Sequence, residues 1–282
     1  MEKIRFLDSQ CIRDTVKKLC IQANMQLPAD VERAIVSAEQ SESWPIAKRT
    51  LSLLEENLRI AGESSLPICQ DTGAACVFLE IGMDVHISGD VYSAVNDGVR
   101  AGYEEGYLRK SIAADPLFRG NTGDNTPAFT TIELIPGDKV RITVAPKGFG
   151  SENMSALKML RPADGEKGVI DFVLDTVRNA GPNPCPPIIL GIGIGGTFDK
   201  VALLAKKALL RPLDERNADP HYAELERKML EKINGIGIGP QGFGGKTTCL
   251  GVAIEKMPTH VAGLPVAVNV SCHATRRASA IL

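Results

Sequence analysis

The stretch PIILGIGIGGTFDKVALLAKKALL, residues 187–210, decides the fold class, because an apolar run is followed at once by a helical pattern. Residues 187–190 predict a short buried strand, and residues 199–210 predict a helix. Outward from this stretch, elements of both kinds alternate without a repeat period. Helices are expected within residues 8–62 and at 88–106, 167–179 and 222–233, and strands at 74–82, 130–135, 139–145, 252–255 and 265–270. We therefore expect an α/β (α+β) protein with a helical N-terminal segment followed by mixed sheets flanked by helices.

The length of 282 residues allows one large domain or two smaller units. We expect a single domain over residues 1–282 with two lobes, 1–162 and 163–282. The 32 basic and 34 acidic residues nearly cancel, so no surface of the kind that binds nucleic acid is expected. The uncharged stretch 182–198 is rich in proline and glycine, which excludes it as a membrane helix. The N-terminus has no apolar signal segment, so a cytoplasmic protein is expected.

The seven cysteines are odd in number and form no C-x-x-C pair, which argues against a disulfide framework and a zinc ribbon. Four segments combine glycine, proline, cysteine and polar residues in a way that a plain core does not need. Each is expected to be a loop that brings the backbone close to a ligand. These segments are PICQDTG (67–73), KGFGSEN (147–153), PCPP with GIGIGG (184–187 and 191–196), and GIGIGPQGFGGK (235–246).

Two nucleotide-binding patterns occur in these segments. Gly191, Gly193 and Gly196 fit G-x-G-x-x-G, with Asp214 about twenty residues further on, as in dinucleotide-binding oxidoreductases. That fold needs a strand between the helix and the acidic residue, and the sequence predicts none, so an oxidoreductase stays a distant alternative. Residues 245–247 end like a phosphate-binding loop, but Pro240 stands where that pattern needs a glycine.

Three cysteines stand out by their surroundings, and they are far apart in the chain. Cys69 lies between Pro67 and Gln70, prolines surround Cys185, and Cys272 ends a strand-like run. Three thiolates brought together by folding could hold an iron–sulfur cluster and leave one iron without a protein ligand. Such an iron is a Lewis acid that can bind a substrate hydroxyl and carboxylate.

Five segments together resemble the class I, iron–sulfur-dependent fumarase and L-tartrate dehydratase family, and more closely its separate α subunit. They are residues 67–73, 147–151, 185–196, 239–246 and 260–276. The resemblance runs from about residue 10 to 282. It implies a hydro-lyase that hydrates fumarate reversibly to (S)-malate, a reaction of the tricarboxylic acid cycle. An L-tartrate dehydratase α subunit, which forms oxaloacetate from tartrate, is the alternative.

The resemblance also implies roles for individual residues. Cys69, Cys185 and Cys272 match the three ligands of a [4Fe-4S] cluster whose fourth iron binds substrate. Gln70, Asp71 and His260 match catalytic positions, with the Asp71 carboxylate taking part in proton transfer. The implied substrate-binding residues are Arg109, Gln70, Asp71, Gly148, Gly150 and His260. No role is assigned to His273, and Cys11, Cys20, Cys76 and Cys249 match no ligand.

A partner is implied as well. The family's catalytic base lies in a C-terminal region that this sequence does not contain. The resemblance therefore implies a separate β subunit that carries the base, a small dicarboxylate as substrate, and an α2β2 heterotetramer.

Overall fold

A computed structural model describes residues 4–282, which form two compact units. The first unit contains the described residues up to Pro28, together with Ile60–Gly148 and Arg276–Leu282. The second contains Ala29–Arg59 and Phe149–Thr275. Each unit is therefore assembled from separate pieces of the chain. Across residues 4–282, no helix has the length and apolar character needed to cross a bilayer.

The first unit is built around a sheet in which β2 is a central strand. The strand order is β10-β5-β2-β4, with β4 parallel to β2 and β5 antiparallel to it. Eight of the nine residues of β2 are buried, as expected for a strand with neighbours on both sides. The strands are β2 (Ala74–Gly82), β4 (Phe129–Ile135), β5 (Val140–Lys147) and β10 (Ala278–Ile281), and a parallel pair is formed by β1 (Arg5–Asp8) and β3 (Val85–Ser88).

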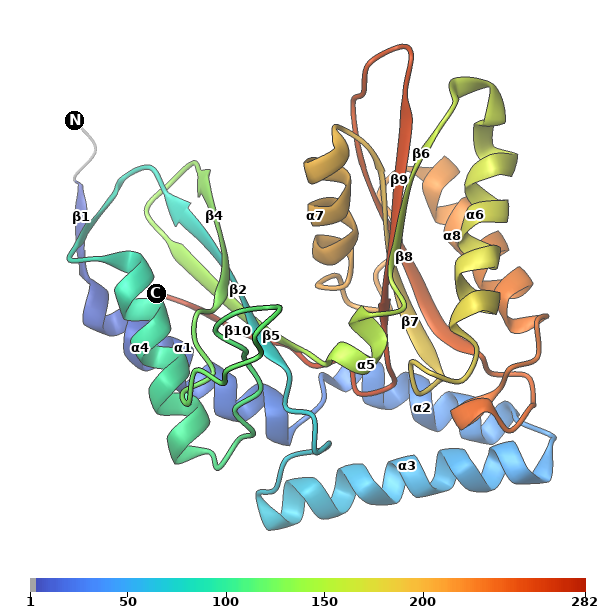
Figure 1. Ribbon diagram of the computed structural model, residues 1–282, viewed down its shortest axis with the longest axis horizontal. Helices are drawn as coiled ribbons and strands as arrows, with labels where there is room; N and C mark the ends of the chain where they lie inside the picture. The colour runs from blue at the N-terminus through green and yellow to red at the C-terminus, as the bar shows by residue number, and fades with distance from the viewer. Residues whose placement is uncertain (1–3) are drawn as a thin grey trace. The chain divides into compact units, whose positions relative to one another are not determined.

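The turn at residues 136–138 joins β4 to β5, but these strands are not neighbours in the sheet. The chain crosses the end of β2 there, and the Gly82 N–H donates to the carbonyl of Lys139 at 2.8 Å. Two helices complete this unit, α1 (Ser9–Met25) and α4 (Val91–Glu105), which pack side by side (Figure 1). The Asp8 carboxylate caps the first turn of α1 by accepting from the Gln10 N–H at 2.8 Å.

The second unit contains a four-stranded sheet of order β6-β9-β7-β8, with α7 on one face and α6 and α8 on the other (Figure 1). Strand β7 is buried along its whole length, between antiparallel β9 and parallel β8. The side chains of Ile188, Leu190, Ile192 and Ile194 in β7 pack with α6 and α8. The elements are β6 (Ala156–Leu160), β7 (Ile188–Gly195), β8 (Cys249–Met257), β9 (Leu264–Ser271), α2 (Ala29–Ser41), α5 (Phe149–Glu152), α6 (Gly165–Ala180), α7 (Phe198–Ala208) and α8 (Pro220–Asn234); α3 (Pro45–Ser64) begins in this unit.

The expectation that residues 191–196 form a ligand-binding loop is wrong, because Gly191 to Gly195 lie inside β7. A Cβ atom at Gly191 would come within 2.1 Å of the Ala205 carbonyl oxygen, and one at Gly193 within 2.2 Å of that of Val201. These glycines let α7 approach the sheet closely. The first two glycines of the dinucleotide pattern therefore serve helix packing, and the next strand after α7 is β8, which begins at Cys249.

A buried carboxylate accepts hydrogen bonds both from the glycine-rich loop at residues 239–247 and from the residues just before α3. Glu42, 4% exposed, accepts hydrogen bonds from the N–H groups of Ser43 at 2.9 Å, Trp44 at 3.0 Å and Lys246 at 2.8 Å. Burial alone would raise the pKa of Glu42, but these N–H donors lower it overall. The Trp44 indole N–H also donates to the Phe243 carbonyl at 3.1 Å. This loop is thus joined to the corner between α2 and α3.

The mixed α/β class, with long N-terminal helices before mixed sheets and flanking helices, is confirmed. The elements that the sequence did not predict are short or polar. They are β1, β3, β6, β10 and α5, each of four or five residues, and two three-residue 3₁₀ helices, η1 (Pro162–Asp164) and η2 (Pro240–Gly242).

Candidate active site

The segment 67–73, just before β2, lies in the first unit and carries three of the predicted site residues. The half-buried Cys69 thiol lies 3.3 Å from the Gln70 side-chain oxygen. The Asp71 carboxylate accepts from the Gly73 N–H through Oδ1 at 3.0 Å. Gly73, with φ of +75°, lets the chain turn into β2. A thiol, an amide and an oriented carboxylate thus follow one another along this segment.

Two buried side chains hold the backbone of this segment. The Tyr103 hydroxyl, at the C-terminal end of α4, lies 3.0 Å from the Thr72 carbonyl oxygen and 2.9 Å from that of Gly73. Burial raises the pKa of Tyr103, so its hydroxyl remains a neutral donor. The fully buried Asn125 donates through Nδ2 to the Gly73 carbonyl at 3.2 Å. The segment is therefore fixed at its junction with β2.

Arg276 is a further part of this site that the predicted residues did not include. Its side chain, 3% exposed, donates from Nη2 to the Asp71 carbonyl at 2.8 Å and from Nη1 to the Asn24 side chain at 3.0 Å. Its Nε has no hydrogen-bond partner among residues 4–282. The available signal in the sequence was its position in the 260–276 motif. A buried guanidinium thus holds the backbone of the predicted proton-transfer residue.

Arg109 lies next to the same segment. The Arg109 N–H donates to the Thr72 hydroxyl at 2.9 Å, and the same hydroxyl donates back to the Arg109 carbonyl oxygen at 3.2 Å. The residue itself is exposed, so the guanidinium can meet a ligand while its backbone is fixed. A planar guanidinium is well suited to binding a carboxylate through two hydrogen bonds.

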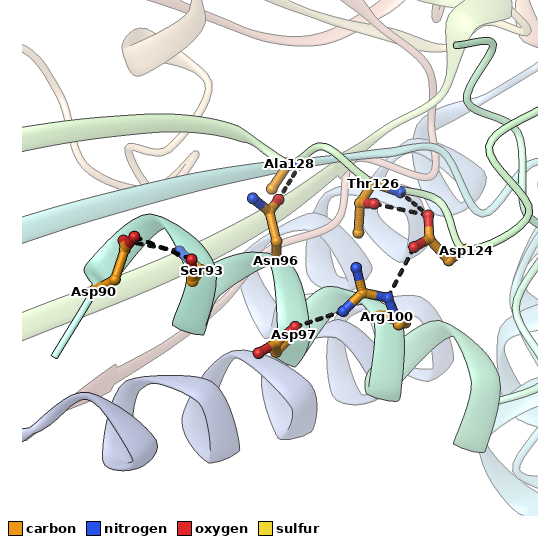
Figure 2. Close-up of polar contacts among 8 residues, drawn as sticks. All are labelled: Asp90, Ser93, Asn96, Asp97, Arg100, Asp124, Thr126 and Ala128. Carbon is orange, nitrogen blue, oxygen red and sulfur yellow. Dashed lines mark hydrogen bonds and ion pairs between the residues drawn. The ribbon is translucent and has the colours of Figure 1, made fainter.

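The loop after α4, which carries Arg109, is anchored back onto that helix (Figure 2). Arg100 donates to the Asp124 carboxylate at 2.8 Å, and the Asn96 side chain accepts from the Ala128 N–H at 2.8 Å. Burial alone would raise the pKa of Asp124, but hydrogen bonds from Thr126 and Arg100 lower it to about 2. Asp124 is therefore an anion that holds this loop in place.

The two predicted glycine contacts differ in their surroundings. A Cβ atom at Gly148 would lie 3.2 Å from Asp71 Oδ2 and 3.8 Å from Arg276 Nη2. Gly148 is therefore next to the Asp71 carboxylate, and a side chain there would crowd it. Gly150 belongs to the second unit, at α5, and a Cβ atom there would meet nothing within 4 Å. Of the two glycines, only Gly148 has a demonstrable steric reason to be glycine.

In the second unit, the structure brings together Cys185 and Cys272. The exposed Cys185 precedes β7, and the half-buried Cys272 follows β9. The His273 N–H donates to the Cys185 carbonyl at 3.5 Å. With standard backbone dimensions, the two cysteine Cα atoms are no more than about 8 Å apart. Two of the three predicted ligands are therefore neighbours.

His260 is not brought together with these cysteines. It precedes β9, whereas Cys272 follows it, so the eight-residue strand separates them. His260 lines a cavity of about 360 Å³ with His221 and Glu166, and its Nδ1 accepts from the Ala262 N–H at 3.2 Å. Its implied contact with substrate or cluster remains a prediction.

Three of the four remaining cysteines are buried and offer a contrast in chemistry, whereas Cys11 is exposed. Burial raises the pKa of Cys20 and of Cys249 to about 12, so both remain protonated thiols. Cys76 is also buried, whereas Cys69, Cys185 and Cys272 are all at least partly exposed. Sulfur ligands bind iron as thiolates, so accessible cysteines fit an iron–sulfur cluster better than buried ones.

The three predicted ligands belong to different units, Cys69 to the first and the other two to the second. Within residues 4–282, no three Cys, His, Asp or Glu side chains are already grouped as a metal site. The convergence of all three thiols therefore remains a prediction. The first unit supplies a carboxylate and an exposed guanidinium, and the second supplies a pair of neighbouring thiols.

The chain is similar over most of its length to one protein family and to named proteins. The family model described as fumarate hydratase (fumerase) matches residues 13–281. A Methanocaldococcus jannaschii protein, provisionally named L(+)-tartrate dehydratase subunit alpha, is 47% identical over 275 residues, covering 95% of this chain and 96% of that protein. The L(+)-tartrate dehydratase subunit alpha of Escherichia coli K12 is 30% identical over 275 residues, covering 96% and 90%.

Proposed function

The chain belongs to the class I fumarate hydratase and L-tartrate dehydratase α subunit family, and from this premise we propose that it is the α subunit of an L(+)-tartrate dehydratase. A hydro-lyase α subunit is what the family match establishes. The 47% identity to a relative named for tartrate carries the choice of substrate. The names of the relatives support the tartrate alternative better than the fumarate hydratase that the sequence first suggested, so fumarate is the second candidate.

The proposed reaction removes water from a dihydroxy dicarboxylate. A hydroxide leaves one central carbon and a proton leaves its neighbour, which gives water and the enol form of oxaloacetate. The enol then tautomerises to oxaloacetate. Fumarate hydration is the opposite reaction, the addition of water across a carbon–carbon double bond, and its substrate carries no hydroxyl groups. A shared site therefore needs groups that hold two carboxylates, a group that moves a proton, and an acid that assists hydroxide departure.

Cys69, Cys185 and Cys272 are the proposed ligands of a [4Fe-4S] cluster. Their accessibility, and the proximity of Cys185 to Cys272, support this assignment. When bound, the cluster supplies a Lewis-acidic iron for the substrate hydroxyl. The cluster also requires reduced thiols. Within residues 4–282 none of the seven cysteines forms a disulfide, which fits the proposed cytoplasmic location.

The first unit supplies the proposed substrate contacts. The exposed Arg109 guanidinium binds a terminal carboxylate of the substrate through paired hydrogen bonds. The hydrogen bond from its backbone N–H to Thr72 fixes the point from which the side chain extends. The Asp71 carboxyl group, held through Oδ1 by the Gly73 N–H, delivers a proton at Oδ2, the oxygen that faces Gly148, to the departing hydroxide, which leaves as water. Gln70 lies between Cys69 and Asp71 and offers an amide to the same ligand.

A β subunit is the proposed partner. The relatives are named as α subunits, which implies a second kind of chain in each enzyme. We assign the base that removes the carbon-bound proton to that β subunit, and we propose an α2β2 assembly. On this basis the α chain alone has little or no activity.

The test is anaerobic co-expression with the β subunit, followed by assays of tartrate dehydration and fumarate hydration. We expect a higher kcat/KM for L(+)-tartrate. Cys185→Ser should abolish activity and lower the iron content, whereas the matched variant Cys11→Ser, at an exposed cysteine, should leave both unchanged. Full activity in Cys185→Ser would contradict the ligand assignment. A higher kcat/KM for fumarate would overturn the choice of substrate.

A further inference from the structure

A hydrogen-bonded network connects the chain segments that carry Cys185 and Cys272. The His273 ring lies with Nδ1 3.0 Å from the Cys185 carbonyl oxygen, and the His273 N–H donates to the same oxygen at 3.5 Å. Because the acceptor is a carbonyl, the shorter contact requires a proton on Nδ1. The residue that follows one cysteine is thus bonded twice to the backbone of the other.

Gln241 joins the same network from a third segment. Its N–H donates to the Pro186 carbonyl at 2.7 Å, and its side-chain Nε2 donates to that oxygen at 2.9 Å. Nε2 also lies 3.3 Å from His273 Nδ1; both atoms carry protons, so this approach is a packing contact and not a hydrogen bond. Gln241 therefore contacts the residue after Cys185 and the residue after Cys272 at the same time.

The loop that carries Gln241 is itself held in place. The Gly244 N–H donates to the Ile238 carbonyl at 2.9 Å, which closes the loop, and Glu42 accepts from Lys246 further along it. Gln241 has φ of +53°, a left-handed conformation that costs a residue with a side chain about 1 kcal/mol. The same holds for Cys185, with φ of +54°. Gln241 is hydrogen-bonded to Pro186, the residue after Cys185, so the two left-handed residues lie in one arrangement maintained by hydrogen bonds.

We infer that Gln241 and His273 are positioning residues that fix the separation of the Cys185 and Cys272 thiols before any iron binds. Cys185 precedes β7 and Cys272 follows β9, which are neighbouring strands of one sheet. Each cysteine lies outside its strand, so the backbone hydrogen bonds between the strands do not fix its position. The network supplies the missing constraint. Outer groups of this kind orient metal ligands, and their loss typically lowers metal affinity about 10-fold or more. The role in iron binding rests on the proposed function, whereas the thiol separation does not.

The test measures thiol separation in the full-length α chain without iron. A short bifunctional thiol-alkylating reagent, dibromobimane, is applied anaerobically, and the Cys185–Cys272 product is quantified by peptide mass spectrometry. We expect this product in the unsubstituted chain, and several-fold less of it in His273→Phe and in Gln241→Met, which keep the size of the side chain but lose its donor. His273→Asn retains a donor near the Nδ1 position and should restore most of the yield.

Matched controls are His221→Phe and Gln40→Met, at exposed positions of the same unit, and both should behave like the unsubstituted chain. Thermal unfolding identifies any variant that fails to fold, in which case the other variant provides the comparison. Unchanged yields in both His273→Phe and Gln241→Met would overturn the inference, as would the absence of the product in the unsubstituted chain. A second readout is the iron content of the co-expressed complex, expected to fall in the same order.

The result separates this inference from the proposed function. If the cross-linking pattern is as expected but the complex holds no iron and dehydrates no tartrate, the proposed function fails and the positioning role stands. If the complex is active but the yield of the Cys185–Cys272 product is the same in the Gln241 and His273 variants as in the unsubstituted chain, the positioning role is wrong and the proposed function stands.

Discussion

Arg276 donates a hydrogen bond from Nη2 to the backbone carbonyl of Asp71 at 2.8 Å, although the two residues are 205 positions apart in the chain. The contact places a buried guanidinium directly behind the carboxylate proposed to transfer a proton. Arg276 also donates to Asn24 of α1. One side chain therefore connects the residues just before β10, the helix α1 and the segment 67–73.

Replacing Arg276 should destabilise the first unit. Arg276→Ala leaves the buried side-chain acceptor of Asn24 and the partly buried carbonyl of Asp71 without their donor, and each such loss costs about 1–3 kcal/mol. We expect the free energy of unfolding to fall by about 3 kcal/mol, measured by urea denaturation. The exposed Arg49 provides the control, since Arg49→Ala should change the free energy of unfolding by less than about 0.5 kcal/mol. Equal effects of the two variants would contradict this role.

A methyl group at Gly148 should disturb catalysis more than stability. In Gly148→Ala the new Cβ atom lies 3.2 Å from Asp71 Oδ2, so the carboxylate must shift from the position that the Gly73 N–H supports. A small displacement of a reacting group lowers kcat/KM, here by about tenfold. The assay is tartrate dehydration by the α–β complex. Gly62→Ala, where a Cβ atom meets nothing within 4 Å, should match the unsubstituted enzyme.

Asp124 should stabilise the loop after α4 in a pH-dependent way. Its pKa is about 2 in the folded protein against an ordinary value of 3.8, so its contribution is complete above pH 4 and is lost as the pH falls towards 2. Asp124→Asn should cost at most about 2 kcal/mol at pH 7 and progressively less towards pH 3. Urea unfolding followed by circular dichroism measures this. Asp175→Asn removes an exposed pair with Arg178 and should have little effect at any pH. A pH-independent cost of Asp124→Asn would refute the linkage.

Glu42 should hold the glycine-rich loop in the second unit through its charge. Its folded pKa lies below the ordinary 4.5, so the stabilisation is present above that value and declines as the pH falls through the lowered one. Glu42→Gln should cost about 1–3 kcal/mol at pH 7, because the charged acceptor of several N–H groups is lost. The fluorescence of Trp44, the single tryptophan, reports unfolding beside the site.

The control for this prediction is Glu56→Gln, at an exposed position of α3. Its unfolding curve should match that of the unsubstituted chain at every pH. A loss in Glu42→Gln that persists unchanged below pH 4 would show that shape, and not charge, holds the loop.

Much of the fold was accessible from local pattern. The 3.6-residue periodicity of α1 and the continuous apolar run of β2 each indicate their element without tertiary information, and both lie where expected. The short strands β1 and β10 have no such signal, because four residues define no period. The strand neighbours of β2 could not be predicted either. The turn at 136–138 is compatible with β4 and β5 as adjacent strands and equally with the observed order, in which β2 lies between them.

The candidate site divides in the same manner. Cys69, Asp71 and Arg109 could be selected from motif and residue type, because thiols, carboxylates and guanidinium groups are recognisable wherever they occur. The glycines of residues 191–196 could not be interpreted in this way, since a glycine that permits helix packing has the same letter as one that approaches a ligand. Only the 2.1 Å approach to the Ala205 carbonyl distinguishes the two.

The sequence by itself determined the class of fold, the family and the residue types available for chemistry, because these depend on local periodicity and on motifs of a few residues. Tertiary structure alone decided that Arg276 supports Asp71 and that Gln241 and His273 connect two cysteine segments. Those contacts join residues between 32 and 205 positions apart. A contact between such distant groups leaves no periodic or compositional trace, so it becomes visible only when the chain is folded.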